Sequence, residues 1–434
     1  MKSAAQSTSP STHAHDVDRR RIDAIWRIES TKLIARLVRI VRDIDTAEEL
    51  AQNVFVTALE RWPTDGVPDS PGAWLWTTAK NRALDVVRRR QMLSRTEATV
   101  AHEHARASDE RRESAENATF DDDDGLGDEV LRLVFVACHP VLSHDARVAL
   151  TLRLVAGLTT EEIARAFLTS PTTLQQRIVR AKRTLADARV PFEVPTGDAL
   201  DERLASALEV IYLVFNEGYA ATAGDDWMRP HLCDDARRLG RMIAARVPDD
   251  AEVHGLVALM EIQSSRTRAR VDAHGAPVLL LEQNRALWDR LLIRRGLDAL
   301  ARSEALSSTR GPYALQAAIA ACHARATTAD ATDWRRIAAL YDEYMERMPS
   351  PVVALNRAVA HGMAFGSAEG LAQLSALDDE PALARYHLLP SVRGDLLQKL
   401  GRHDEARVEF ERAASMTENA RERAVLLARA RDGR

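Results

Sequence analysis

Residues 170–183 carry hydroxyl, amide and guanidinium groups at a spacing that suits contact with a nucleic acid. Gln176, Arg180 and Arg183 recur roughly one helical turn apart, and Ser170 with Pro171 precedes them. Amide or guanidinium groups near the start of such a helix can read base edges, while later arginines bind phosphates. The predicted chemistry is therefore non-covalent DNA recognition, and the alternative is a helical hairpin with a solvated basic face. The candidate residues are Ser170, Thr172, Thr173, Gln176, Arg177, Arg180 and Arg183.

A second cluster, PGAWLWTTAKNRALDVVRRR at 71–90, places two tryptophans among cations. Asn81 offers both a donor and an acceptor to a base edge, and the alternative is an N-cap for a following helix. Trp74 fits a buried helix face, whereas Trp76 lies about 200° away on a helix and is better placed to reach the surface. The candidate nucleic-acid contacts in this cluster are Trp76, Lys80, Asn81, Arg82, Arg88, Arg89 and Arg90.

A third cluster is acidic and precedes the second one. Thr46, followed three residues later by Glu49, predicts a capping box and a helix that runs to Trp62, where Pro63 ends it. An acidic helix face suits a basic partner, because complementary charge speeds docking. An ordinary solvated helix face is the alternative. The acidic-polar set is Asp45, Glu48, Glu49, Gln52 and Asn53.

The elements that would position the first cluster form a helix-turn-helix over residues 158–185. Glu161 and Glu162 suit the first turn of one helix, and Pro171 suits the first position of the next. The second helix would place an apolar strip opposite the basic face. That strip contains Leu174, Ile178, Ala181 and Leu185.

Composition bounds the remaining possibilities. The 434 residues carry a net charge of −5, with 46% hydrophobic and 28% charged residues, which is typical of globular proteins. The charge is uneven, since residues 147–190 hold eight arginines and lysines against three acidic residues. The three cysteines are far apart, so we expect buried thiols, no metal site, no cofactor and a reducing cytoplasm. A polar start and the lack of a long apolar run predict neither a signal peptide nor a membrane span.

Alanine, arginine and leucine dominate the sequence, so we expect an all-α fold. Apolar periodicity and polar or proline-rich breaks predict the following order. The predicted parts are a disordered tail at 1–15, a helical domain at 16–90, a flexible linker at 91–127, a second helical domain at 128–190, a hinge at 191–197 and a helical repeat domain at 198–434.

The sequence resembles the extracytoplasmic-function sigma factors of bacterial RNA polymerase. Residues 43–62 resemble the family's polymerase-docking helix, 71–90 the element that reads and opens the promoter −10 region, and 146–185 the domain that binds the −35 element. These motifs stand in family order and cover about 16–190. The simplest members of the family end near residue 191, and the whole chain resembles a subgroup with a tetratricopeptide-like extension.

This resemblance implies partners and roles for the three clusters. The acidic-polar set would bind core RNA polymerase, the 71–90 set would contact the −10 element as a single strand, and the 170–183 set would contact double-stranded −35 DNA. The resemblance favours a base-capturing loop at Asn81, and it implies a part in regulation for the extension, with a regulatory protein as its partner. No covalent step is implied.

The C-terminal half shows repeats but no catalytic constellation, so we do not expect an enzyme. Gly366 and Gly401 are 35 residues apart, close to the tetratricopeptide length of about 34. The last unit fits best, with small or aromatic residues at Gly394, Gly401, Ala406, Phe410 and Ala413. We expect helices at 312–326, 333–348 and 351–364.

A separate motif in this half consists of Asn216, Glu217, Gly218 and Tyr219. Gly218 is predicted to be the C-cap of an apolar helix. The motif fits a capped, buried helix and a partner contact equally well.

Two other functions compete with the sigma factor. One is a helix-turn-helix regulator that senses a ligand through its repeats, and the other is a repeat scaffold whose N-terminal half is merely helical. Neither requires the clusters at 43–90, so those clusters discriminate between the hypotheses.

Overall fold

The computed structural model describes residues 10–101, 126–166, 169–220, 228–273, 275–417 and 419–432. All regular secondary structure within these ranges is helical, apart from an isolated antiparallel β-bridge between Val271 and Pro277. The all-α prediction is therefore confirmed. None of the helices in this part of the chain combines the length and apolar character needed to cross a membrane.

The chain divides into two compact units. The first contains residues 1–163 and 171–207, and the second contains residues 164–170 and 208–434. One of the boundaries between them lies inside a helix, α8, which runs from Asp198 to Tyr219.

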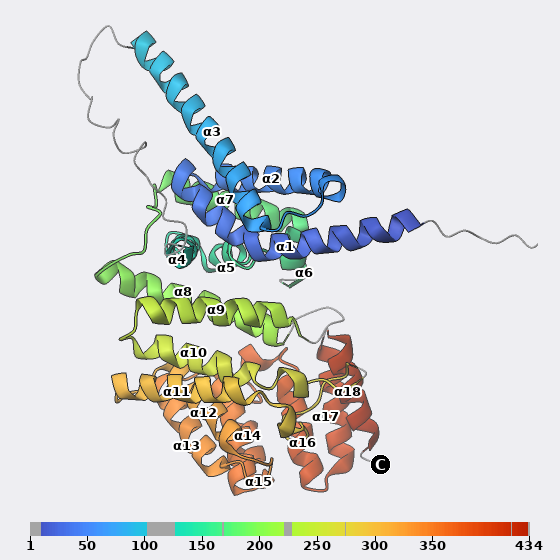
Figure 1. Ribbon diagram of the computed structural model, residues 1–434. Helices are drawn as coiled ribbons and strands as arrows, with labels where there is room; N and C mark the ends of the chain where they lie inside the picture. Colours follow the sequence, from blue (N-terminus) through green and yellow to red (C-terminus); the bar gives the residue numbers. More distant parts are fainter. Residues whose placement is uncertain are drawn as a thin grey trace, which may run out of the picture. The chain divides into compact units, whose positions relative to one another are not determined.

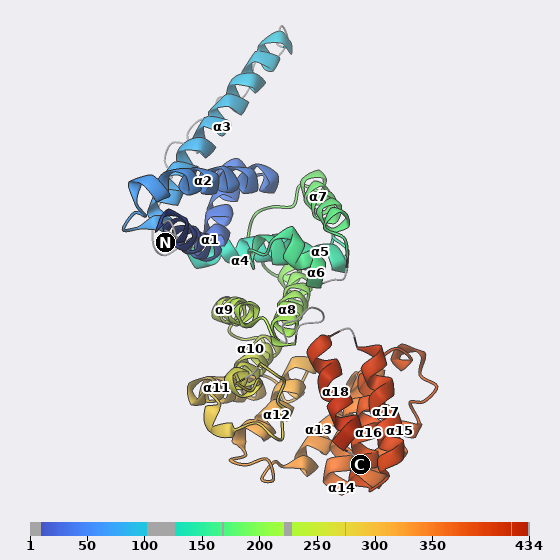
Figure 2. The ribbon, with the colours of Figure 1, turned by 90° about the vertical axis from the view of Figure 1, so that its right-hand side faces the viewer.

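Three helices begin the first unit: α1 (Pro10–Val41), α2 (Ile44–Asp65) and α3 (Pro71–Ala101). α1 packs against both α2 and α3, and Trp26 of α1 stacks on Phe55 of α2 with ring centroids 4.5 Å apart. Leu37, Val54 and Leu75 are almost completely buried between the three helices. The C-terminal half of α3 projects beyond α1 and α2 (Figures 1 and 2).

Two predicted boundaries in this part are wrong. α1 begins at Pro10, inside the tail predicted for 1–15. α3 continues to Ala101, so the first eleven residues of the predicted linker at 91–127 are helical. These residues contain good helix formers such as Gln91, Met92 and Leu93. Residues 102–125 of that linker lie outside the described residues.

A second group of helices follows: α4 (Leu126–Ala137), α5 (His144–Leu154), α6 (Thr160–Ala166) and α7 (Pro171–Asp187). Cys138 lies fully buried directly after α4, as predicted for a structural thiol. Two contacts tie this group to α1. The Thr31 hydroxyl donates to the Val155 carbonyl at 2.9 Å, and Arg39 pairs with Glu129 at 2.7 Å. Residues 190–196, which include most of the hinge predicted at 191–197, are not helical.

The second unit is a succession of helices. They are the end of α8, then α9 (Pro230–Arg246), α10 (Ala251–Ser264), α11 (Arg290–Leu306), α12 (Pro312–Arg325), α13 (Trp334–Arg347), α14 (Pro351–Phe365), α15 (Ser367–Ser375), α16 (Leu388–Lys399), α17 (His403–Met416) and α18 (Ala420–Asp432), with short 3-10 turns η1 (Thr267–Ala269), η2 (Arg285–Leu287) and η3 (Pro381–Leu383). The predicted helices at 312–326, 333–348 and 351–364 are confirmed within a residue at each end.

Helices of the second unit pack mainly on their sequence neighbours. α13 contacts α14, α14 contacts α15, and α16, α17 and α18 lie side by side (Figures 1 and 2). Gly394 of α16 faces Phe410 of α17 so closely that an added Cβ would lie 2.9 Å from the ring. Phe410, Ala406 and Ala413 are buried.

Candidate nucleic-acid interface

The two helices of the predicted helix-turn-helix form as α6 and α7, while residues 167 and 168 between them lie outside the described residues. The Thr159 hydroxyl accepts from the Glu162 amide at 3.1 Å, and the Glu162 carboxylate accepts from the Thr159 amide at 2.8 Å, which is a reciprocal capping box at the start of α6. α7 begins at Pro171, since proline suits a position whose N–H needs no helical partner. Its buried strip is the predicted one: Leu174, Ile178, Ala181 and Leu185.

The polar and basic side chains predicted for DNA lie on the outer part of α7. Arg177 is half-buried and pairs with Asp145 at 3.4 Å, and Arg183 is exposed and pairs loosely with Asp187 at 3.7 Å. The structure therefore presents most of this set to solvent on one side of a single helix. The exposed members are Ser170, Thr172, Thr173, Gln176, Arg180 and Arg183.

α3 carries the second candidate set, and it differs from the prediction at Asn81. The helix is continuous through this residue, so Asn81 neither caps a following helix nor lies in a loop. Ala79 and Ala83 on either side are fully buried against the rest of the bundle, which keeps the backbone helical here. The Asn81 side chain itself is exposed and lies on the same helix face as Arg88.

The helical spacing predicted that Trp74 is buried and that Trp76 reaches the surface, but both side chains are half-buried. Trp74 is half-buried and packs edge-on against the buried Trp62, with ring centroids 5.4 Å apart. Trp76 is also half-buried, because the Arg36 guanidinium of α1 lies over its ring, 5.1 Å from the centroid. Arg36 would have to move before a base could stack on that face of Trp76.

Several cations of the second set hold α3 against its neighbours. Arg82 donates to the Thr57 hydroxyl of α2 at 2.9 Å, and Arg90 donates to the Thr46 hydroxyl at 2.6 Å. Lys80 is half-buried. Arg88 and Arg89 remain exposed on the projecting part of α3. The most accessible members of the predicted −10 set are therefore Asn81, Arg88 and Arg89.

α2 begins differently from the prediction. Asp43, not Thr46, is the N-cap: its carboxylate accepts from the Thr46 amide at 2.7 Å and from the Thr46 hydroxyl. Asp43 lies three residues before Thr46, so its carboxylate can cap the first turn, and the predicted capping box from Thr46 to Glu49 does not mark the helix start. The helix also includes Pro63, because a proline in the last turn removes only one hydrogen bond, and the Gly66 amide closes the end by donating to Trp62.

The acidic-polar set of α2, which we call the docking surface, is Asp45, Glu48, Glu49, Gln52 and Asn53. Glu49, Gln52, Asn53 and Asp45 are exposed, whereas Glu48 is buried.

Glu48 lies at the centre of an ion-pair cluster that links α2 to the helix-turn-helix part of the first unit. Arg153 of α5 donates to its carboxylate from two nitrogens, at 2.8 and 2.7 Å, and Lys182 of α7 donates at 2.6 Å. Lys182 also reaches Asp45 at 2.8 Å, and Gln52 donates to Glu48 at 3.1 Å.

The electrostatics of this cluster favour the charged forms of Glu48 and Lys182. Burial by itself would raise the pKa of the Glu48 carboxyl, but the charges and hydrogen bonds of Lys182 and Arg153 lower it below its ordinary value. Burial would likewise lower the pKa of Lys182, but Glu48 and Asp45 raise it. Both groups are therefore ionised at neutral pH, and each offsets the desolvation of the other.

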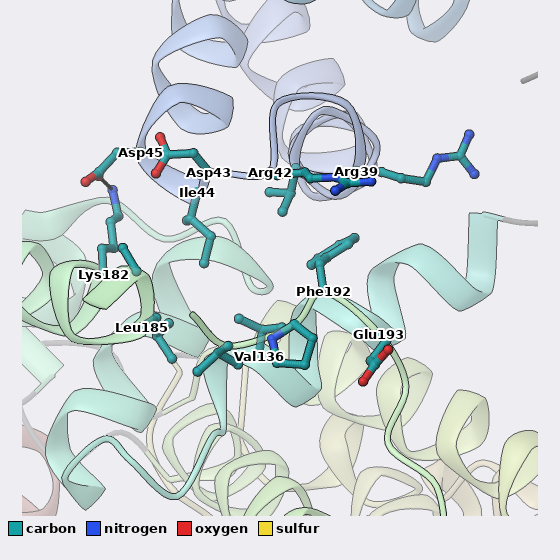
Figure 3. Close-up of a pocket in the computed structure, with 14 residues that line it drawn as sticks. Arg39, Arg42, Asp43, Ile44, Asp45, Val136, Lys182, Leu185, Phe192 and Glu193 are labelled. Atoms are coloured by element: carbon teal, nitrogen blue, oxygen red, sulfur yellow. Dashed lines mark hydrogen bonds and ion pairs between the residues drawn. The ribbon is translucent and has the colours of Figure 1, made fainter. Parts of the chain in front are cut away.

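Lys182 and Arg153 are residues to which the sequence pattern assigns no role. Both add to the basic charge of 147–190, but Lys182 lies beside the apolar strip of α7 rather than on its outer face. Only the packing of α7 near α2 reveals its partner. Figure 3 shows Lys182 extending to Asp45 at one edge of a cavity of about 460 Å³, whose wall includes Ile44, Leu185 and Phe192.

The motif at 216–219 lies in the last turn of α8. Gly218 is inside the helix and is not its C-cap, because the start of α9 passes directly over it. Glu217 pairs with Arg229 at 2.5 Å, and the Arg270 guanidinium lies 3.5 Å from the centroid of the Tyr219 ring. These contacts are internal to the second unit and support the packing interpretation of the motif.

Comparison with known families agrees with this arrangement. Residues 28–92 match Sigma-70 region 2, and residues 132–185 match Sigma-70, region 4. The first match contains α2 and most of α3, and the second contains α5, α6 and all but the last two residues of α7. Residues 203–304, in the second unit, match a family of unknown function (DUF6596).

Similar proteins give the same result. The chain is 32% identical over 160 residues to the ECF RNA polymerase sigma factor SigK of Mycobacterium ulcerans, covering 36% of this chain and 78% of that protein. It is 26% identical over 174 residues to the probable ECF RNA polymerase sigma factor SigI of Mycobacterium tuberculosis, covering 40% and 57%. An uncharacterized protein of Rhizobium meliloti is 44% identical over 393 residues, 90% of each chain.

The two helical bundles with their matched regions define a sigma-70-type transcription initiation factor. Within that class, the chain belongs to the ECF RNA polymerase sigma factors.

Proposed function

We propose that α2 docks this sigma factor on core RNA polymerase, that α3 contacts the promoter −10 element, and that α7 reads the −35 element. The observation that carries the proposal is the outer side of α7, where exposed hydroxyl, amide and guanidinium groups follow one another along a helix that begins at Pro171. This is the arrangement with which a recognition helix contacts base edges and phosphates.

On α7, the roles divide by chemistry. Thr172, Thr173 and Gln176 lie nearest the helix start and would contact base edges, while Arg180 and Arg183 would bind phosphates. Phosphate contacts release counterions, so binding should weaken steeply as salt rises.

On α3, the accessible groups are Asn81, Arg88 and Arg89. Asn81 would hydrogen-bond an exposed base, and the two arginines would neutralise the backbone of the separated strand. Strand opening would be driven by binding free energy from polymerase and DNA, without any covalent step.

The second unit would act as a tetratricopeptide-like regulatory domain that binds a protein partner. Neighbour-on-neighbour packing of α13 to α18 and the close contact between Gly394 and Phe410 support this interpretation. The motif at 216–219 is not required for it, because its side chains contact the unit itself.

Transcription reconstituted with core polymerase on genomic promoter fragments tests these assignments. We expect promoter-specific transcripts with the full chain, a strong loss with Arg180→Ala, and no loss with Arg325→Ala, a matched exposed arginine at the end of α12. Absence of specific transcripts from the wild type would overturn the assignment and favour the ligand-sensing regulator.

A second arm tests the regulatory role. A chain that ends at residue 195, shown to be helical by circular dichroism, is compared with the full chain in the same assay. Lower activity would make the second unit an activator and higher activity an inhibitor, whereas equal activity would remove the regulatory role.

A further inference from the structure

The docking surface is partly covered by the chain's own helix-turn-helix part. Glu48 has a side chain only 9% exposed, and its carboxylate is occupied by Arg153 and Lys182. Lys182 also forms an ion pair with Asp45. Two of the carboxylates that would meet a basic surface on polymerase are thus already paired with cations from α5 and α7.

We propose that α5 and α7 form a reversible cap on the docking surface, so that polymerase must displace Lys182 and Arg153 from Asp45 and Glu48 before α2 can dock. The proposal rests on the proposed function, because it takes α2 as the element that binds polymerase. It adds a closed form of the first unit in which polymerase binding is suppressed by the sigma factor itself.

The packing around the ion pairs favours reversibility. On one side lies the cavity of about 460 Å³ shown in Figure 3, and on the other lies a groove of about 390 Å³ lined by residues that include Glu49, Gln175 and Val179. α7 is therefore incompletely packed against α2. The ion pairs carry the contact, and their attraction is largely offset by the desolvation of the charges.

The cap leaves the predicted DNA surface accessible. Lys182 points toward α2, whereas Gln176, Arg180 and Arg183 of the same helix are exposed. The closed form would thus suppress polymerase docking more than −35 DNA binding. This separation distinguishes the cap from general misfolding or general occlusion.

The test compares two charge reversals in the full-length protein. Lys182→Glu places a carboxylate against Asp45 and Glu48 and should open the cap by like-charge repulsion. Arg325→Glu is the matched control, because it makes the same change in net charge at an exposed arginine that belongs neither to the docking surface nor to the candidate DNA contacts. Affinity for core polymerase is measured by fluorescence anisotropy, without DNA.

If the open form is the usual minor state of roughly 0.1–10%, its apparent affinity is reduced by that fraction, so Lys182→Glu should bind polymerase about tenfold to a thousandfold more tightly than wild type. Arg325→Glu should bind as wild type does. Equal or weaker polymerase binding by Lys182→Glu would overturn the cap while leaving the sigma assignment intact. No polymerase binding by the wild type or either variant would overturn the proposed function together with the cap.

A distance measurement in the free protein provides a readout that does not depend on polymerase. Spin labels on Glu60→Cys in α2 and Asp187→Cys in α7 report the separation, and the native cysteines are buried. We expect one short distance at low salt, a longer population as salt screens the ion pairs, and mainly the longer population with Lys182→Glu. An unchanged distance in that variant would overturn the cap.

Discussion

Gly218 lies in the last turn of α8, where the backbone at the start of α9 passes closest to it. A Cβ at this position would lie 2.7 Å from the Cys233 amide nitrogen, 2.8 Å from the Leu232 Cβ and 3.0 Å from the Arg229 carbonyl oxygen. Two of these atoms belong to the backbone, so they cannot move aside by a change of rotamer. Gly218→Ala must therefore displace α9 from α8.

The size of the effect follows from this geometry. Overpacking of a core costs about 1–3 kcal/mol, and contacts with backbone place Gly218→Ala at about 3 kcal/mol. For a domain of the size of residues 208–434, each kcal/mol lowers the melting temperature by about 2–4 °C. The variant should therefore melt about 6–12 °C below wild type in the transition of the second unit.

Scanning calorimetry measures this shift, and Gly401→Ala is the matched control in the same unit. Gly401 has φ +75° and no atom within 4 Å of an added Cβ, so the control carries only the left-handed backbone penalty of about 1–2 kcal/mol. A Gly218→Ala shift no larger than that of Gly401→Ala would refute the packing argument. The motif at 216–219 would then be better explained by a partner contact.

Three further predictions concern DNA and pH. In salt-titrated binding assays, Arg180→Ala should weaken binding to all DNA sequences and lower the slope of affinity against salt by about one. Gln176→Ala should reduce the discrimination between bases at one −35 position by about 1–3 kcal/mol. Equal effects of the two variants would contradict the assignment. Asn81→Ala should reduce −10 recognition in strand-opening assays but not polymerase affinity, because Asn81 is exposed and alanine favours the helix; loss of both would indicate misfolding. Burial and Arg266 lower the pKa of His323 from 6.5 to about 4, so the unfolded chain gains a proton that the folded chain does not. Stability should fall by up to about 3 kcal/mol between pH 6.5 and 4, and His323→Gln should remove that part of the pH dependence in urea unfolding; an unchanged pH dependence would contradict it.

Local features of the fold were predictable because they depend on short stretches of sequence. Pro171 marks the start of α7, and the Leu174–Leu185 strip follows from helical periodicity. Thr159 and Glu162 form a capping box at α6, although the prediction placed such a box at Thr46 instead. There, Asp43 takes the cap, because its carboxylate accepts from the Thr46 amide and the helix therefore begins before Thr46.

Features that depend on distant neighbours were predicted incorrectly or not at all. Helical continuity through Asn81 follows from the burial of Ala79 and Ala83, and the place of Gly218 inside α8 follows from the approach of α9. The sequence predicted that Arg82 contacts DNA. Its guanidinium instead donates to the hydroxyl of Thr57, twenty-five positions earlier in the chain. A sequence pattern records which groups are present on a helix face but not which of them another helix has already engaged.

The sequence by itself determined the helical class, the order of the three polar clusters along the chain, and the outward polar side of α7, because each is encoded by composition and periodicity within one segment. Only the tertiary structure decided which carboxylates of α2 are accessible. Glu48 and Lys182 are separated by more than a hundred residues, and no local pattern relates them. Their pairing exists because folding of the first unit brings α2 near α5 and α7, where two buried charges must be neutralised together.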